Sequence, residues 1–395
     1  MNGSNQKDVK LTNRHLLYEC IRKNGPLTLT VLERTTNLSR PTVAGLVREM
    51  EKDNLIKKMG LESSSGGRAP MLYGINPDAF YALGIDFDFP TSRMAISNLN
   101  GHIVFASKKG ISRRMNTRQV LDALIEQIDS LIIESGLNRS QLLGIGFGMP
   151  GTIDYKNGRS IVFERIADWQ NVSLSEVLTD RFRIPVVMEN DVHMLTWAER
   201  RLWTRADFSN MLFISIRSGI GMSVMMNGSV LEGQFGNAGF IGHTVVDVNG
   251  PECSCGKRGC LEVFASELHM MNMYAEKTGR ALSNIRELFD IAHKEDPVAR
   301  EIIASAGYYL GIGIGNAALT FDIPTVVVSA WFDHSSLLER AQETVDRTIN
   351  QFRREGKIQI FPGRLCEEEY ALGGCLRMIE VAQMSSASRV IANAQ

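Results

Sequence analysis

The spacing of apolar residues changes near position 80 and divides the chain into two parts. Before that point, helical spacing marks segments 13–23, 28–36 and 39–54, and two short strand-like segments follow at 55–59 and 71–75. After it, buried strand-like runs alternate with longer amphipathic helices, and this arrangement occurs twice. The pattern predicts a small N-terminal helical module followed by an α/β body with two lobes around a cleft.

Segment 39–54, SRPTVAGLVREMEKDN, has the clearest helical pattern of the N-terminal module. Its apolar residues recur at i, i+3, i+4 and i+7, as Val43, Leu46, Val47 and Met50. Ser39 is suited to cap the helix, and Pro41 falls in the first turn, where a missing N–H does little harm. We therefore expect an amphipathic helix with one buried stripe.

Helix, short helix, tight turn and helix form a helix-turn-helix, whose last helix enters the DNA major groove. The two short strands then flank ESSSGGRAP (62–70), which we interpret as a wing with a flexible glycine tip. The expected DNA contacts are Arg40, Thr42 and Arg48 on the helix, with Arg68 in the minor groove. A small helical domain used for protein contact or dimerisation is the alternative.

Charge is distributed unevenly along the chain. Residues 1–70 hold 12 Lys and Arg against 7 Asp and Glu, whereas the whole chain has a net charge of −1. The net charge excludes an overall basic nucleic-acid binder, and the asymmetry favours a basic module on an acidic body. The N-terminus lacks the apolar region of a signal peptide, and no apolar run approaches a membrane span. We therefore expect no membrane partner. Because the chain has six cysteines and three of them are clustered, we expect a cytoplasmic protein without disulfides.

The body is expected to begin with three consecutive strands over 82–109, followed by a helix at 120–136 and a strand at 142–148. The expected domains are a winged helix-turn-helix at 1–78, a first lobe at 79–188 and a second lobe at 189–383. The second lobe would carry the cysteine-rich loop and the dimer contacts, and a C-terminal helix at 384–395 could return to the first lobe.

The segment HTVVDVNGPECSCGKRGCLEVF (243–264) brings four potential metal ligands together: His243, Cys253, Cys255 and Cys260. Three thiolates and one imidazole form a closed tetrahedral zinc set. Gly256 and Gly259 let the backbone turn tightly enough to gather the ligands. Because protein would fill all four positions, the predicted zinc is structural. The alternative is three free cysteines in a glycine-rich loop.

Several motifs resemble the ROK family, which joins sugar kinases to repressors of sugar operons. They are GMPG (148–151), WQNVSL (169–174), END (189–191), NAGFIGH (237–243) and CSCGKRGCLE (253–262). KNGPLT, SRPTVAGLVREM and GGRAP are similar to the repressor branch, typified by the xylose and N-acetylglucosamine repressors. The resemblance implies an actin-like, two-lobed sugar kinase fold behind the winged helix-turn-helix.

The nucleotide-binding elements of the family's kinases are altered in this chain. Their first turn, Asp-x-Gly-Gly-Thr, is replaced by Asp86-Phe87-Asp88-Phe89-Pro90-Thr91, and their Gly-Thr-Gly turn by Arg217-Ser218-Gly219. A phosphate cradle needs small residues so that backbone N–H groups can reach the oxygens. We therefore expect no enzyme activity. A sugar kinase with an added DNA-binding domain is the alternative.

The resemblance also implies a sugar site at Asn190, Asp191, His243 and Glu262. His243 would bind zinc through one ring nitrogen and face the sugar with the other. An N-cap for the following helix is the alternative role of Asn190 and Asp191. Phe240 stands where the family has a sugar-binding glutamate, so the effector could be a modified sugar or be replaced by a protein partner.

Together these features predict a transcriptional regulator, with repression of a carbohydrate operon as the expected action. It would bind operator DNA as a homodimer, or as a tetramer of two such dimers, and respond to a sugar or sugar derivative between the lobes.

Overall fold

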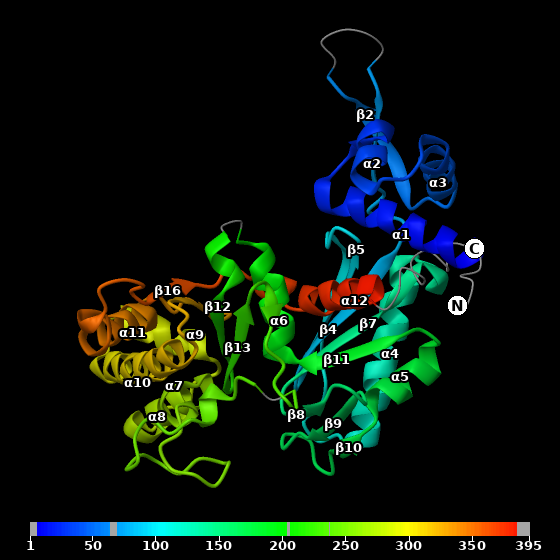
Figure 1. Ribbon diagram of the computed structural model, residues 1–395. Coiled ribbons are helices and arrows are strands. Elements are labelled where there is room, and N and C mark those ends of the chain that lie inside the picture. The colour runs from blue at the N-terminus through cyan, green and yellow to red at the C-terminus, as the bar shows by residue number, and fades with distance from the viewer. Residues whose placement is uncertain (1–5, 64–68, 204–205, 237, 385–395) are drawn as a thin grey trace.

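The computed structural model describes residues 6–63, 69–203, 206–236 and 238–384. A winged helix-turn-helix domain stands on the first of two α/β lobes (Figure 1). Its helices are α1 (Gln6–Asn24), α2 (Leu29–Thr36) and α3 (Arg40–Lys52). Its antiparallel sheet has the order β1-β3-β2, from β1 (Leu27–Thr28), β2 (Ile56–Leu61) and β3 (Met71–Ile75).

Helix α3 forms as its sequence predicts. The Ser39 side chain accepts a hydrogen bond from the Thr42 N–H, and Pro41 lies in the first turn. The four residues of the predicted stripe are buried, none of them more than 5% exposed. Burial of such side chains contributes about 1.5–3 kcal/mol each, which fixes α3 against the rest of the domain.

The first lobe contains a five-stranded sheet of order β11-β7-β4-β5-β6. Its strands are β4 (Tyr81–Asp88), β5 (Thr91–Asn98), β6 (Ile103–Gly110), β7 (Leu142–Met149) and β11 (Val186–Asn190). The three expected consecutive strands are β4, β5 and β6, which pair as an antiparallel meander, and β4, β7 and β11 are parallel. Its helices are α4 (Thr117–Ser135), α5 (Leu174–Phe182) and α12 (Leu372–Met384).

Helix α12 lies along the first-lobe sheet, where it contacts β4, β7 and α6 (Asp191–Arg201) (Figure 1). The expected division placed this segment in the second lobe, so that assignment needs correction. The reason is steric: a Cβ on Gly84 would lie 1.9 Å from the Ala371 carbonyl oxygen, and one on Gly146 would lie 2.0 Å from that of Gly374. Strand glycines thus make the close approach possible. The expected C-terminal helix falls on 385–395, outside the described residues.

A small antiparallel sheet, unforeseen from the sequence, follows β7. It has the order β10-β9-β8 and consists of β8 (Thr152–Asp154), β9 (Arg159–Val162) and β10 (Gln170–Val172). Trp169 lies at its edge and donates its indole N–H to the Ser160 hydroxyl over 2.8 Å. This sheet places residues 163–165 at the mouth of the interlobe cleft.

The second lobe has a sheet of order β14-β13-β12-β15-β16. Its strands are β12 (Met211–Ile216), β13 (Ile220–Met226), β14 (Ser229–Val230), β15 (Thr325–Ser329) and β16 (Gln359–Pro362). Its helices are α7 (Glu262–Ala265), α8 (Glu267–Thr278), α9 (Ile285–His293), α10 (Pro297–Phe321) and α11 (Ser335–Thr348). The two lobes together also contain short 3₁₀ helices, which are η1 (Arg139–Gln141), η2 (Ala206–Ser209), η3 (Ile241–His243), η4 (Asn350–Phe352) and η5 (Glu367–Glu369).

Helix α10 is, among the described residues, the one helix that is long and apolar enough to cross a membrane by those criteria alone. More than half of its apolar window is buried inside the protein. It packs against α7, α8, α9 and α11. These contacts identify it as the central helix of the second lobe.

Candidate functional site

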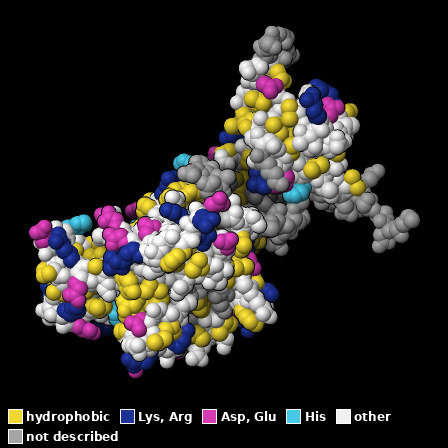
Figure 2. Space-filling model, turned by 60° about the vertical axis from the view of Figure 1, so that its left-hand side comes forward, with side chains coloured by type: hydrophobic (Ala, Val, Ile, Leu, Met, Phe, Trp, Pro, Cys, Tyr) yellow, Lys and Arg dark blue, Asp and Glu magenta, His cyan; other side chains and the backbone are white. Residues whose placement is uncertain are grey.

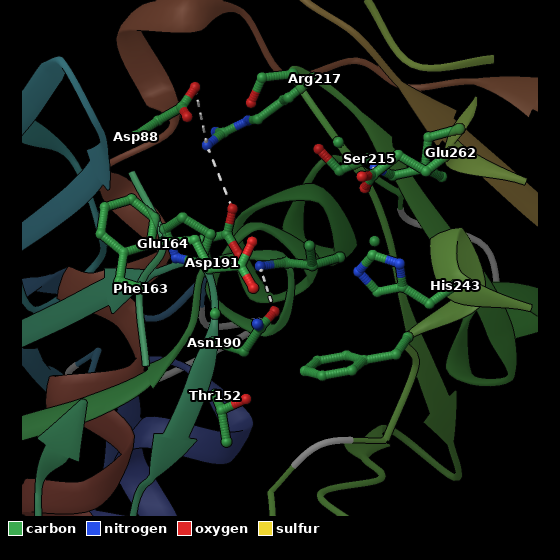
Figure 3. A pocket seen from close by; sticks show the side chains of 18 of the residues that line it. Asp88, Thr152, Phe163, Glu164, Asn190, Asp191, Ser215, Arg217, His243 and Glu262 are labelled. Carbon is green, nitrogen blue, oxygen red and sulfur yellow. Dashed lines mark hydrogen bonds and ion pairs between the residues drawn. The ribbon is translucent and has the colours of Figure 1, made fainter. Parts of the chain in front are cut away.

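A cleft of about 380 Å³ lies between the two lobes (Figure 3). All four residues expected at the effector site line it, although they are up to 72 positions apart: Asn190, Asp191, His243 and Glu262. The first lobe also contributes Asp88, Thr152, Phe163, Glu164 and Arg165, and the second lobe Ser215, Arg217 and Phe240. The cleft has the size of a small-molecule site and combines apolar walls with a few polar groups.

Asn190 and Asp191 stand where β11 meets α6. The Asn190 side-chain oxygen accepts a hydrogen bond from the Val192 N–H at 3.0 Å and so caps α6. The alternative N-cap role therefore applies to Asn190, while its side chain still borders the cleft. The Asp191 carboxylate lies 3.5 Å from Arg217 Nη1.

The Asp191 carboxyl group is buried, and its pKa is raised to about 6. Burial is the largest cause, because a desolvated carboxylate is costly. Arg217 opposes the rise, whereas the neighbouring carboxylates of Asp86 and Asp88 add to it. Asp191 is thus a strong hydrogen-bond acceptor near neutral pH, positioned to meet a hydroxyl group in the cleft.

Glu262 enters the cleft from the first residue of α7. Its Oε2 accepts a hydrogen bond from the Ile220 N–H at 3.4 Å. Gly219 leaves room for this contact, since a Cβ there would lie 2.6 Å from Glu262 Oε2. Gly219, in the segment Arg217-Ser218-Gly219, therefore allows the Glu262 carboxylate to lie close to the backbone.

The four expected metal ligands form one cluster. All the ligand atoms of His243, Cys253, Cys255 and Cys260 lie within 4.8 Å of one another. His243 Nδ1 is 3.6 Å from Cys253 Sγ, and the sulfurs of Cys255 and Cys260 are also 3.6 Å apart. Zinc bond lengths of ~2.3 Å to sulfur and ~2.0 Å to nitrogen imply tetrahedral edges of roughly 3.5–3.8 Å. The cluster therefore fits a metal such as zinc.

The backbone around this cluster turns through two glycines with positive φ, Gly256 at 83° and Gly259 at 70°. Gly259 packs directly on the Asp247 carbonyl oxygen, where no Cβ could fit. The Lys257 ammonium donates to the His243 carbonyl oxygen over 2.7 Å. Because His243 and Cys255 also line the cleft, the metal-ligand loop forms part of its wall.

The segment expected to replace the first turn runs from the end of β4 to the start of β5 and carries two buried aromatic side chains. Phe87 and Phe89 are buried with ring centroids 6.2 Å apart, and Phe87 stacks on Trp169 at 6.4 Å. Asp86, one residue before, forms a bidentate pair with Arg217 at 3.0 and 3.2 Å. From the sequence we interpreted both segments as departures from the kinase motif, but the spacing did not indicate that their charged residues pair.

The predicted DNA face lies on α3. Arg40 and Arg48 are exposed, and Thr42 is partly buried with its hydroxyl 2.8 Å from that of Ser39. Arg68 lies outside the described residues. Lys57 and Lys58 on β2 are also exposed, although the sequence reading did not single them out. Figure 2 shows a group of Lys and Arg side chains on this domain, which projects from the body.

The sequence model of the ROK family matches residues 82–378, about three quarters of the chain. The chain belongs to the ROK family. This confirms the resemblance drawn from the motifs.

Two curated relatives are similar over most of their length. The xylose repressor of Bacillus spizizenii is 31% identical over 363 residues, which cover 92% of this chain and 91% of the relative. The transcriptional dual regulator NagC of Escherichia coli K12 is 26% identical over 330 residues, covering 81% and 80%. The first match extends beyond the two lobes expected of a sugar kinase fold alone, because it covers nearly the whole chain.

Solved structures show the same fold. A ROK family transcriptional regulator, a homologue of the E. coli MLC protein, superposes with a TM-score of 0.77 at 22% identity and covers 98% of this chain and 99% of its own. A ROK family glucokinase from Streptomyces griseus has a TM-score of 0.65 at 21% identity and covers 75% of this chain and 98% of its own. The expected fold, a winged helix before an actin-like kinase fold, is confirmed.

Proposed function

We propose that this protein is a transcriptional regulator that binds operator DNA through its winged helix-turn-helix domain. The observation that carries this proposal is the exposure of Arg40 and Arg48 on a capped α3 whose opposite face is buried. An exposed basic face on the second helix of such a motif suits the DNA major groove. The names of the relatives, xylose repressor and NagC, support regulation, with repression as the expected sign.

A sugar or sugar derivative in the interlobe cleft is the proposed effector. Asp191, Glu262 and Asn190 offer oxygen and amide groups to hydroxyls, and Phe240, 41% exposed at the rim, offers an apolar face. Apolar ring faces and hydroxyl groups are the two surfaces a sugar presents. Zinc at His243 and the three cysteines would hold the cleft wall in place, and all four positions would be protein ligands, so its role would be structural.

The regulator would work as a cytoplasmic homodimer, or as a pair of dimers, because two heads match the two half-sites of a palindromic operator. The effector would change the spacing of the two winged helix-turn-helix domains. The size of that shift is limited by how much more tightly the effector binds one arrangement of the lobes than the other.

A sugar kinase carrying a DNA-binding domain is the alternative, favoured by the retained Asp191 in the cleft. Against it stand the aromatic side chains in the first turn and the Arg217 side chain of the second turn, whose guanidinium already pairs with Asp86. A coupled ATP-turnover assay over a panel of monosaccharides tests it, and turnover that depends on Asp191 would replace our proposal with this one.

Selection of genomic DNA fragments by the purified protein, at two salt concentrations, tests DNA binding directly. The matched variants are Arg40→Ala on α3 and Arg183→Ala, whose exposed side chain lies on the first lobe. We expect a few palindromic sites that Arg183→Ala retains and Arg40→Ala loses. Salt separates specific from phosphate-only binding, since the latter weakens steeply as salt rises. Equal recovery by both variants would reassign the domain to protein contact.

A further inference from the structure

Arg217 lies at the centre of a buried cluster of charges between the two lobes (Figure 3). It follows β12 of the second lobe, whereas Asp86 and Asp88 belong to β4 of the first lobe. Its Nη1 lies 3.0 Å from Asp86 Oδ1, 3.5 Å from Asp191 Oδ2 and 3.9 Å from Asp88 Oδ2. One guanidinium nitrogen therefore faces three carboxylates, and the second, Nη2, makes a further bond to Asp86 at 3.2 Å.

The surroundings hold Arg217 in this position. Its backbone N–H donates to the Gly219 carbonyl oxygen, and its carbonyl oxygen accepts from the N–H of Glu267 at the start of α8. Its guanidinium lies 4.6 Å from the centroid of the Tyr370 ring, in the segment before α12. Both ends of the residue are thus fixed, the backbone by the second lobe and the side chain by the first.

The other cations near the cluster come from the first lobe. Arg93 on β5 pairs with Asp86 at 3.1 Å and also with Glu367. Arg165 lies 3.5 Å from Asp88 and also donates to the Ser218 hydroxyl. In the described ion pairs of this cluster, Arg217 is the cation that belongs to the second lobe and pairs with carboxylates of the first lobe.

We propose that the Arg217 guanidinium holds the two lobes together by pairing with the carboxylates of Asp86, Asp88 and Asp191. Without this side chain, the three carboxylates would form a site for a divalent cation. The inference goes beyond the proposed function, since it concerns what holds the lobes and requires neither DNA nor a sugar. Asp86, Asp88 and Asp191 repel one another unless a cation lies between them. Burial alone lowers the pKa of Arg217, but these carboxylates outweigh it and raise the pKa, so the side chain stays charged.

A cation of the right chemistry should be able to replace the guanidinium once the side chain is removed. Ca²⁺ binds carboxylate oxygens at about 2.3–2.6 Å and tolerates irregular geometry, whereas Mg²⁺ demands a near-octahedral shell. The nearest carboxylate oxygens are 3.0–3.9 Å from Nη1, so they must move inward, and the adaptable ion is favoured. Truncation of the Arg217 side chain should therefore leave a carboxylate site that added Ca²⁺ can occupy in place of the guanidinium.

The experiment compares full-length wild type, Arg217→Ser and Arg217→Ser/Asp88→Asn by thermal unfolding with and without CaCl₂, and with MgCl₂ in a second series. We expect no cation effect on wild type and a lower Tm for Arg217→Ser. Millimolar Ca²⁺ should raise the Tm of that variant by about 2 °C or more, since a ligand that binds only the folded state stabilises it. The double variant should lose most of this response. An Arg217→Ser protein as stable as wild type, or one that ignores Ca²⁺, overturns the proposal.

A triple variant, Arg217→Ser/Asp86→Asn/Asp88→Asn, keeps the test decisive if Arg217→Ser fails to fold. It removes the cation and most of the repulsion, so it should fold without the guanidinium. Small-angle scattering at matched oligomeric state should then give a larger radius of gyration than wild type. An unchanged radius of gyration would show that the guanidinium does not hold the lobes.

Discussion

We predict that Glu267, the first residue of α8, makes the stability of the second lobe sensitive to pH. Its Oε1 accepts a hydrogen bond from the Trp331 indole N–H at 2.7 Å. The pKa of the Glu267 carboxyl group is raised from 4.5 to about 8. Burial is the main cause, and the charge of Asp88 adds to it, while the Trp331 hydrogen bond, Arg217 and Arg93 oppose it. The folded protein therefore holds this carboxyl group protonated at neutral pH.

The direction of the pH effect follows from the raised pKa. A folded-state pKa above the unfolded value gives a stabilisation that is complete below about pH 4.5 and is lost as the pH rises through about 8. A difference of about 3.5 pKa units corresponds to at most ~5 kcal/mol, and residual solvent contact reduces this to the order of 2–5 kcal/mol. Glu267→Gln keeps the acceptor for Trp331 but cannot ionise. We expect the variant to match wild type at pH 5 and to exceed its free energy of unfolding by that amount at pH 9.

Urea denaturation at pH 5, 7 and 9, followed by tryptophan fluorescence, measures this difference. Glu189 and Asp191 also have raised pKa values, about 7 and about 6, but both proteins share them, so the comparison isolates Glu267. Glu276→Gln, exposed on the same helix, is the matched control and should follow wild type at every pH. A gap between Glu267→Gln and wild type below about 1 kcal/mol at pH 9 would refute the reasoning.

Three further predictions concern single side chains. Cys253→Ser should lower bound zinc from one per chain to none and reduce Tm. Cys366→Ser, outside the cluster, should retain the metal. Equal metal content of the two variants by mass spectrometry would refute the ligand assignment. Leu32→Ala in the fully buried core of the winged helix should cost about 2–5 kcal/mol, seen as faster amide exchange across that domain and not the lobes. Gly311→Ala should cost about 1–3 kcal/mol by urea unfolding, because its Cβ would lie 2.6 Å from the Ala341 carbonyl oxygen; no loss would mean that α10 and α11 can separate freely.

The features that the sequence predicts well depend on residues close to one another in the chain. The cap at Ser39 and the stripe on α3 lie within one helix, so their spacing alone predicts the structure. The zinc-ligand cluster spans 18 residues, and ligand type and spacing bring it together without knowledge of the fold. The motifs that indicate the ROK family are equally local.

The features that the sequence does not show depend on distant pairs. Arg217 and Asp86 are 131 positions apart, and nothing in the sequence around either residue indicates that they pair. Helix α12 reaches the first lobe because Gly84 and Gly146, both more than 200 residues earlier in the chain, leave room for it on the sheet. The strands of the small sheet and β16 are three or four residues long, too short for an alternating pattern to stand out.

Several polar groups that line the cleft already have partners within the protein. The Asn190 oxygen caps α6, the Asp191 carboxylate faces Arg217, and the Glu262 carboxylate accepts from Ile220. A hydroxyl group that binds any of them must share or displace an internal contact, and the contact of Asp191 with Arg217 is part of what joins the lobes. Under our proposal, a ligand that displaces the contact of Asp191 with Arg217 would bind one arrangement of the lobes more tightly than the other, which is the thermodynamic requirement for an effector. The Asp191 contact is thus the one among these three that would connect occupancy of the cleft to the relative position of the lobes, if Arg217 holds them together as we propose.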